Sequence, residues 1–254
     1  MTKTRFIKSP NGYNLAYTYT QGDVAKSSVV FLGGFCSDMQ GTKAIFLEKL
    51  AKEENFSYLR LDYGGHGESG GVFKDCSIQS WFEDALHIIE QITDGDLNVI
   101  GSSMGGWISY LIAEAISDRV KALISIAPAP DFTDEFLDDM NTEQKTMYDE
   151  KGYFTAPNEY SDEPYIFSKK LIEESRQCFL LEKGIAYNGP VHILHGTDDH
   201  IVPIDKPERI KKALSSQNVE IHYIEGGDHS LSQPENLELL KNTLFSLQSR
   251  IKQG

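Results

Sequence analysis

The feature that most constrains this chain is the pattern Gly101-x-Ser103-x-Gly105. Before it, Leu97–Ile100 is a short apolar run typical of a buried strand, and after it apolar residues recur at three- and four-residue spacing, which predicts a helix. A serine at so sharp a strand-to-helix turn is held in a strained backbone conformation with its hydroxyl exposed, and it needs glycines on both flanks. Ser103 is therefore predicted to be a nucleophile. The alternative is a glycine-rich turn in which the serine is incidental.

Strands and helices alternate on both sides of this turn. Asn11-Gly12 predicts a hairpin between strands at Thr4–Lys8 and Tyr13–Thr20. The other expected strands are Ser28–Gly33, Tyr58–Asp62, Leu97–Ile100, Ala122–Ala127, Val191–His195 and Glu220–Ile224. Besides the helix after Ser103, helices are expected at Lys43–Glu53, Ile78–Ile92, Pro207–Leu214 and Glu235–Ile251. This alternation predicts an α/β fold with an eight-stranded, mostly parallel sheet and helices on both faces.

Residues 131–188 break the alternation. Short helices, a small hairpin and a further helix are expected within them, at 131–150, at Tyr153–Pro157 with Pro164–Ser168, and at Lys169–Leu181, respectively. The polar residues 158–163 would form the turn of the hairpin. We expect one domain, residues 1–254, in which this segment is a cap insertion.

The cap is expected to contribute aromatic wall to a substrate site, and we assign substrate binding to Phe154, Tyr165 and Phe167. Such a wall would suit an apolar acyl chain. Two alternatives stay open: the insertion could be a solvated excursion, or the three aromatic residues could form only the core of the cap.

Length, charge and cysteine content narrow the class of protein. The 254 residues are enough for one large α/β domain with an insertion. The formal net charge of −14 disfavours nucleic acid or an anionic membrane as a partner, whereas it would suit a basic protein. No apolar run approaches membrane-spanning length, and no signal-peptide core is visible. The three scattered cysteines lack metal-ligand spacing, so we expect free thiols, a cytoplasmic location, and neither metal nor organic cofactor.

A serine nucleophile needs a general base, which open α/β sheets place on loops after the carboxyl ends of strands. His229 lies directly after the last expected strand and is the best candidate. His195 ends a strand and is expected to shape the backbone below the site, and His66 is expected to be a structural turn residue. The remaining histidines lie on a helix, within strands or at an exposed position: His87, His192, His222 and His200.

The histidine needs an acid that orients it. Asp198 and Asp199 follow the strand at Val191–His195, and the local sequence does not choose between them because either could cap the turn through its own side chain. Asp131, after the preceding strand, is a third option.

The arrangement resembles the α/β-hydrolase superfamily over essentially the whole chain. The chain order of serine, aspartate and histidine is that of the superfamily. Its acid motif, H-G-x-x-D-x-x-V-P, is matched from His195 to Pro203, so the resemblance implies Asp199 as the acid. It also implies an oxyanion hole made by the backbone N–H groups of Met104 and Phe35. Many members carry His-Gly in the loop where this chain has Gly33-Gly34-Phe35.

Residues 33–44 and 62–70 resemble a narrower group, the abhydrolase-domain subgroup that contains a mitochondrial acyl-protein thioesterase also able to cleave acyl glucuronides. The resemblance implies a serine hydrolase that cleaves carboxylic esters or thioesters of a small molecule or an acyl-protein through an acyl-enzyme. A peptidase or lipase of the same fold is the first alternative, with the acidic residues of 131–150 available to a free amine. A non-catalytic binding protein on a hydrolase scaffold is the second, which the intact set of three residues disfavours.

Overall fold

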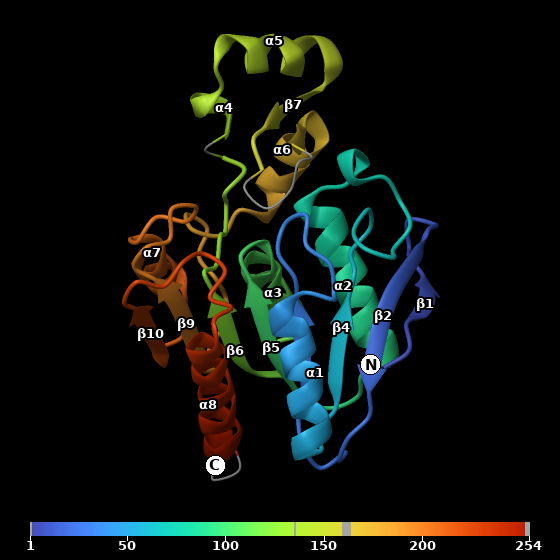
Figure 1. Cartoon of the computed structure of the whole chain (residues 1–254), viewed down its shortest axis with the longest axis vertical. Coiled ribbons are helices and arrows are strands. Elements are labelled where there is room, and N and C mark those ends of the chain that lie inside the picture. The colour runs from blue at the N-terminus through green and yellow to red at the C-terminus, as the bar shows by residue number, and fades with distance from the viewer. Residues whose placement is uncertain (1, 135, 159–163, 252–254) are drawn as a thin grey trace.

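Figure 1 shows a twisted sheet between two layers of helices, seen in a computed structural model that describes residues 2–134, 136–158 and 164–251. The sheet has eight strands in the order β1-β2-β4-β3-β5-β6-β9-β10, with the two pairings of β2 antiparallel and the others parallel. These strands are Arg5–Lys8 (β1), Asn14–Thr20 (β2), Ser28–Leu32 (β3), Tyr58–Leu61 (β4), Leu97–Ser102 (β5), Val120–Ile126 (β6), Val191–Gly196 (β9) and Val219–Ile224 (β10). The predicted mostly parallel sheet of eight strands, opened by a hairpin, is confirmed.

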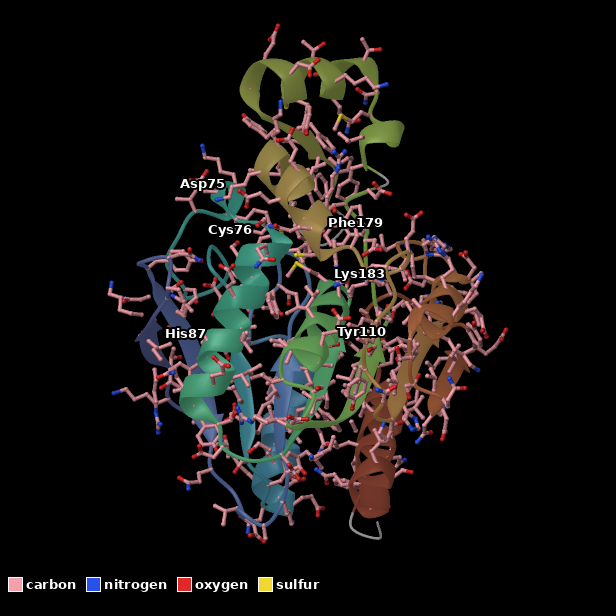
Figure 2. The ribbon with its side chains drawn as sticks, turned by 180° about the vertical axis from the view of Figure 1, so that it is seen from behind. Asp75, Cys76, His87, Tyr110, Phe179 and Lys183 are labelled. Carbon is pink, nitrogen blue, oxygen red and sulfur yellow. The ribbon has the colours of Figure 1, made fainter. Side chains whose placement is uncertain are left out.

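Helices cover both faces of the sheet, as predicted. Thr42–Glu54 (α1) and Pro234–Ile251 (α8) pack on one face through a layer that includes Leu47 and Leu244. Ile78–Ile92 (α2), Met104–Ala115 (α3) and Lys206–Ala213 (α7) pack on the other. Figure 2 shows that second face, with His87 on α2 and Tyr110 on α3.

The central strands and α2 show why these segments fold as they do. Every residue of β3 and β5 is buried, as expected of strands covered on both faces. The α2 helix begins with a capping box at Ser77, whose hydroxyl accepts the Ser80 backbone N–H. Its buried face then follows the three- and four-residue spacing of Trp81, Ala85, Ile88 and Ile89.

Between β6 and β9 the chain leaves the sheet and folds above the carboxyl ends of the strands, at the top of Figure 1. Its elements are Phe136–Asp139 (α4), Thr142–Lys151 (α5), Tyr153–Ala156 (β7), Tyr165–Ser168 (β8), Lys169–Ser175 (α6) and a 3-10 turn at Arg176–Cys178 (η2). The hairpin β7–β8 is antiparallel and pairs Phe154 with Phe167. Its expected turn falls partly on residues 159–163, which lie outside the described residues.

The helix expected at Lys169–Leu181 is shorter than predicted. The α6 helix ends at Ser175, and only one 3-10 turn follows it. At Leu180 and Leu181, where the helix was expected to end, the backbone is held instead by Asp131, in the loop after β6. Its carboxylate accepts the backbone N–H groups of Leu180 and Leu181 at 2.9 and 2.8 Å, so those amides do not continue a helix. Asp131 thereby joins the two ends of the insertion.

Two further observations concern the predictions from composition. None of the helices in the described part of the chain is both long and apolar enough to cross a membrane. Cys36, Cys76 and Cys178 are all free thiols.

Another short 3-10 turn, Phe73–Asp75 (η1), lies in the loop between β4 and α2.

Candidate active site

Ser103 occupies the sharp turn between β5 and α3. Its backbone angles, φ 54° and ψ −118°, lie in a region that residues other than glycine rarely adopt. A Cβ on Gly101 would collide with the carbonyl of Gly105, and a Cβ on Gly105 would collide with the carbonyl of Leu32. The glycines therefore let the strand and the helix approach closely enough to make this turn, as the sequence pattern predicts.

His229 joins Ser103 to Asp199. It lies on the loop after β10, where its Nε2 is 3.0 Å from Ser103 Oγ and its Nδ1 is 2.8 Å from Asp199 Oδ2. With the proton on Nδ1 donated to the carboxylate, Nε2 is left to accept the serine hydroxyl. The ring is 13% exposed, so a substrate can reach it.

Asp199, and not its neighbour Asp198, faces His229. Its buried carboxylate also accepts the backbone N–H groups of Ile201 and Val202 at 2.8 and 2.9 Å. Burial alone would raise the pKa of Asp199, but the hydrogen bonds from His229 and these amides outweigh it and lower the pKa, which keeps the carboxylate ionised. Asp198 is exposed, and Asp131 is occupied at the base of the insertion.

The other two histidines considered in detail are structural in this geometry. His195 is fully buried below Asp199, and its Nε2 donates to the Val202 carbonyl at 3.2 Å. Burial lowers its pKa, which favours the neutral ring. His66 packs against Trp81 and Phe73 in the loop after β4, and burial lowers its pKa to about 4.

Two residues that the sequence analysis gave no role hold the loops of the site. Lys43 Nζ, on α1, donates to the Ser230 carbonyl beside His229 and lies 3.3 Å from Ser232 Oγ; burial lowers its pKa to about 8. Asp62 accepts the Met39 N–H at 2.7 Å and the Glu68 N–H at 2.8 Å, which ties the loop after β3 to the loop after β4. Lys43 lies in the motif at 33–44 and Asp62 in the motif at 62–70. Their membership of these motifs is the sequence feature that could have predicted a role for them.

A cavity of about 580 Å³ opens beside Ser103 and His229, within the size range of ligand pockets. One wall is aromatic and combines residues of the β3 loop and the insertion: Phe35, Phe132, Phe136, Tyr165 and Phe167. Polar residues also line the cavity, among them Lys43, Asn158 and the exposed Ser37 and Asp38. Another cavity, of about 440 Å³, lies near the starts of β3 and β5, at the opposite end of the sheet from Ser103.

The structure brings Tyr165 and Phe167 to the cavity and leaves Phe154 out of it. Among the described residues of the cavity wall Phe154 is absent; its ring stacks behind Phe167 at 5.2 Å, and its side chain is buried. Phe154 is therefore core of the insertion, the alternative that the sequence left open. Phe132 and Phe136 line the cavity instead, and sequence reasoning missed them.

Phe35 and Met104, the two expected oxyanion donors, each follow a residue at a close contact: Gly34 precedes Phe35, Ser103 precedes Met104, and these two lie against each other. A Cβ on Gly34 would lie 3.4 Å from Ser103 Cβ, so the β3 loop passes directly against the serine turn. The Phe35 ring turns away into the aromatic wall, stacked on Phe167 at 5.4 Å with an interplanar angle of 3°.

Comparison with known proteins places this site in a family. The sequence model described as serine aminopeptidase, S33, matches residues 23–151. Bovine (Bos taurus) mitochondrial palmitoyl-protein thioesterase ABHD10 is 32% identical over 247 residues, which cover 97% of this chain and 80% of that protein. Among solved structures, mouse α/β-hydrolase domain-containing protein 10 has a TM-score of 0.90 at 29% identity and is covered over 100% of its length by 98% of this chain.

A second solved structure, of a protein from Agrobacterium vitis S4, has a TM-score of 0.92 at 32% identity, covering 98% of this chain and 99% of that one. Both similarities extend over the sheet, the helices and the insertion, because almost the whole chain is aligned. The chain belongs to the α/β-hydrolase superfamily, in the family that contains the ABHD10 proteins, and it is a serine hydrolase.

Proposed function

We propose that this hydrolase cleaves acyl thioesters or esters through an acyl-enzyme on Ser103, with His229 as the general base and Asp199 as the acid that orients it. The observation that carries the proposal is the hydrogen-bonded series Ser103–His229–Asp199 opening into an aromatic cavity. A serine hydroxyl is a weak nucleophile unless a base accepts its proton, and this series supplies that base.

The reaction follows from these contacts. Ser103 Oγ attacks the acyl carbonyl while its proton passes to His229 Nε2, and Asp199 stabilises the imidazolium that results. The tetrahedral intermediate collapses, and the departing thiol or alcohol takes the proton from His229. Water then attacks the acyl-enzyme with His229 again as base, and the carboxylic acid leaves.

The oxyanion of the intermediate would be held by the backbone N–H groups of Phe35 and Met104. Support comes from the contact between Gly34 and Ser103 and from the position of Met104 at the first turn of α3, where backbone N–H groups have no partner within the helix. Both donors belong to the backbone, so the absence of His-Gly from this loop leaves them in place.

The acyl chain would occupy the aromatic cavity. Each methylene group removed from water contributes about 0.8 kcal/mol, so a wall with five aromatic rings favours long apolar chains over acetate. The leaving group would then lie beside the exposed Ser37 and Asp38, where an acylated cysteine of a protein could stand. The name of the bovine relative, a palmitoyl-protein thioesterase, supports this choice of substrate class. The cytoplasmic location stays a prediction; the same name describes that relative as mitochondrial.

An aminopeptidase is the second candidate, favoured by the description of the matching family model. Such an enzyme needs acidic groups that bind a free amine. Among the described residues of 131–150, those that line the cavity are Phe132 and Phe136, and Asp38 is the one carboxylate among all its described lining residues. The cavity therefore supports an acyl chain better than an amino terminus.

The test compares p-nitrophenyl esters from acetate to palmitate with matched acyl thioesters, for the wild type and for Ser103→Ala. We expect activity to rise with chain length, and we expect Ser103→Ala to lose about 10⁶ in kcat while it keeps its melting temperature. A folded Ser103→Ala that keeps more than a few per cent of the activity would contradict the mechanism. If the wild type hydrolyses neither esters nor thioesters but does hydrolyse aminoacyl substrates, the aminopeptidase becomes the better assignment.

A further inference from the structure

We propose that His192, Glu220 and His222 form a binding site for a transition-metal ion of the Zn²⁺ type, at the outer edge of the sheet and separate from the hydrolase reaction. The site follows from strand geometry. Strands β9 and β10 are parallel, with Glu220 in register with His192 and His222 in register with Leu194. Residues two apart on a strand face the same side, and partners in register share a face, so the three side chains gather on one face of the sheet.

The ligand atoms are already close together. His192 Nδ1 and His222 Nε2 are 2.9 Å apart and share a hydrogen bond, and the two ring centroids are 5.2 Å apart. Glu220 Oε1 lies 3.9 Å from the other nitrogen of His192, Nε2. One ligand atom from each residue can be chosen so that all three lie within 4.8 Å of one another. Tetrahedral zinc with bonds of about 2.0–2.1 Å holds its ligands about 3.3 Å apart, which is close to the spacing of the two nitrogens. In place of the hydrogen bond between them, the two rings would turn so that one nitrogen of each faces the ion.

The donor set decides the class of ion. Two imidazoles and one carboxylate suit Zn²⁺ and similar first-row metals, whereas Mg²⁺ and Ca²⁺ prefer sets of oxygen ligands. His192 is 4% exposed and Glu220 is 42% exposed, so the ion would be held from the packed side and would face water on the other. The carboxylate and the negative net charge of the chain both favour a cation there.

This site lies far from the reaction. His192 stands near the start of β9, whereas Asp199 follows the end of that strand, and the strand from His192 to Gly196 alone spans about 13 Å. An ion bound there would join the edge strand β10 to its neighbour and stabilise the edge of the sheet. The sequence analysis expected no metal from the spacing of the cysteines. His192 and His222 are 30 residues apart in the chain, and the register of β9 and β10 is what unites them.

The experiment is calorimetric titration of the chelator-treated full chain with ZnCl₂, and with MgCl₂ as the contrasting ion. Three variants are compared: His222→Gln, Glu220→Gln and, as a matched control, His87→Gln. His87 is a lone histidine on α2, on the opposite side of the molecule from β9 and β10 in Figure 2.

We expect one Zn²⁺ per chain for the wild type and His87→Gln, at least tenfold weaker binding for His222→Gln and Glu220→Gln, and no comparable binding of Mg²⁺. The melting temperature should rise with Zn²⁺ in the wild type and His87→Gln only. Because the Glu220 side chain reaches solvent, its variant keeps the test valid if His222→Gln fails to fold. Zinc binding that is equal in all variants, or absent from the wild type, would overturn the site. Ester hydrolysis by Glu220→Gln should match the wild type in chelator, which separates this outcome from any failure of the proposed function.

Discussion

Asp199 and Asp198 are neighbours in sequence whose carboxylates have different surroundings. Asp199 holds His229 and two backbone amides, whereas Asp198 is exposed. We expect Asp199→Asn to lower kcat by about 10⁴, because an amide no longer fixes the proton of His229 on Nδ1. The matched change Asp198→Asn should stay within about twofold of the wild type, since surface substitutions of this kind have small effects. The measurement is the rate of ester hydrolysis by the two purified variants. Equal losses of kcat would contradict the role of Asp199 as the acid that orients His229.

At the level of single residues, the sequence predicts those whose local pattern is distinctive. Ser103 and His229 stand in glycine-rich loops after strands, and the structure places them 3.0 Å apart. The choice of Asp199 needed the superfamily motif, because both aspartates can cap the turn. Lys43 and Ser230 are 187 residues apart, and nothing in either local sequence indicates that they meet.

The α1 helix and strand β4 are joined by a buried ion pair between Glu48 and Arg60. The side chains are 3% and 1% exposed, and Arg60 also donates to the Met39 carbonyl. We expect Glu48→Gln to lower the free energy of unfolding by about 3 kcal/mol at pH 7, because it leaves the guanidinium buried without its counter-charge. Urea denaturation measures the difference, with Glu53→Gln on the exposed side of the same helix as the control.

The contribution of Glu48 also has a defined pH dependence. Burial alone would raise its pKa, but hydrogen bonds from Lys52, Thr2 and Arg60 outweigh burial and lower the pKa to about 2. Because the pKa of an unfolded glutamate is about 4.3, the folded chain gains stability from Glu48 above that pH and loses it as the pH falls towards 2. The difference between the wild type and Glu48→Gln should stay constant from pH 7 to 5 and shrink below pH 4. A constant difference throughout would refute this assignment.

The β8 strand gives a matched pair of variants for the cavity. Phe167 faces the cavity and Ile166, its neighbour, is not among the described lining residues. Phe167→Ala should reduce kcat/KM for a palmitoyl substrate relative to an acetyl substrate by about tenfold, because apolar wall is lost from the acyl site. Ile166→Ala should keep the chain-length preference of the wild type. The same preference in both variants would show that the acyl chain lies elsewhere.

Elements with strong periodicity were predictable, and the insertion was predictable only in part. The α2 helix matches its predicted bounds because its apolar stripe and capping residue agree. The β7–β8 hairpin was also expected, but strand alternation cannot tell that Phe167 lies against Phe35 and Phe154 behind it. Nothing in the local sequence around Phe132 and Phe136 distinguishes these two rings from the other aromatic residues of the insertion, so their place in the cavity had no signal.

For the molecule as a whole, the net charge of −14 creates a negative field that attracts basic partners. We expect kcat/KM for a palmitoylated peptide rich in lysine to fall several-fold between low salt and about 0.2 M NaCl, because salt screens this attraction. A neutral palmitoylated peptide of the same length is the control and should change little. Equal salt dependence of the two peptides would show that the surface charge does not guide the substrate.

The fold class follows from the alternation of strands and helices, but the order of the strands does not. Parallel neighbours such as β3 and β5 are far apart in the chain, and the exchange that places β4 between β2 and β3 is fixed by pairing in the folded sheet. The same reason hid the histidines of β9 and β10 from the sequence: each local segment reads as an ordinary strand.

The central claim is that Ser103 carries the acyl group, and covalent labelling tests it most directly. The full chain is treated with a long-chain alkyl fluorophosphonate, and the modified peptide is located by mass spectrometry. We predict one adduct per chain on Ser103, no adduct in Ser103→Ala, and strongly slowed labelling in His229→Gln, because the histidine activates the hydroxyl. The adjacent Ser102 serves as an internal control within the same peptide. An adduct on another residue, or equal labelling of wild type and Ser103→Ala, would contradict the account.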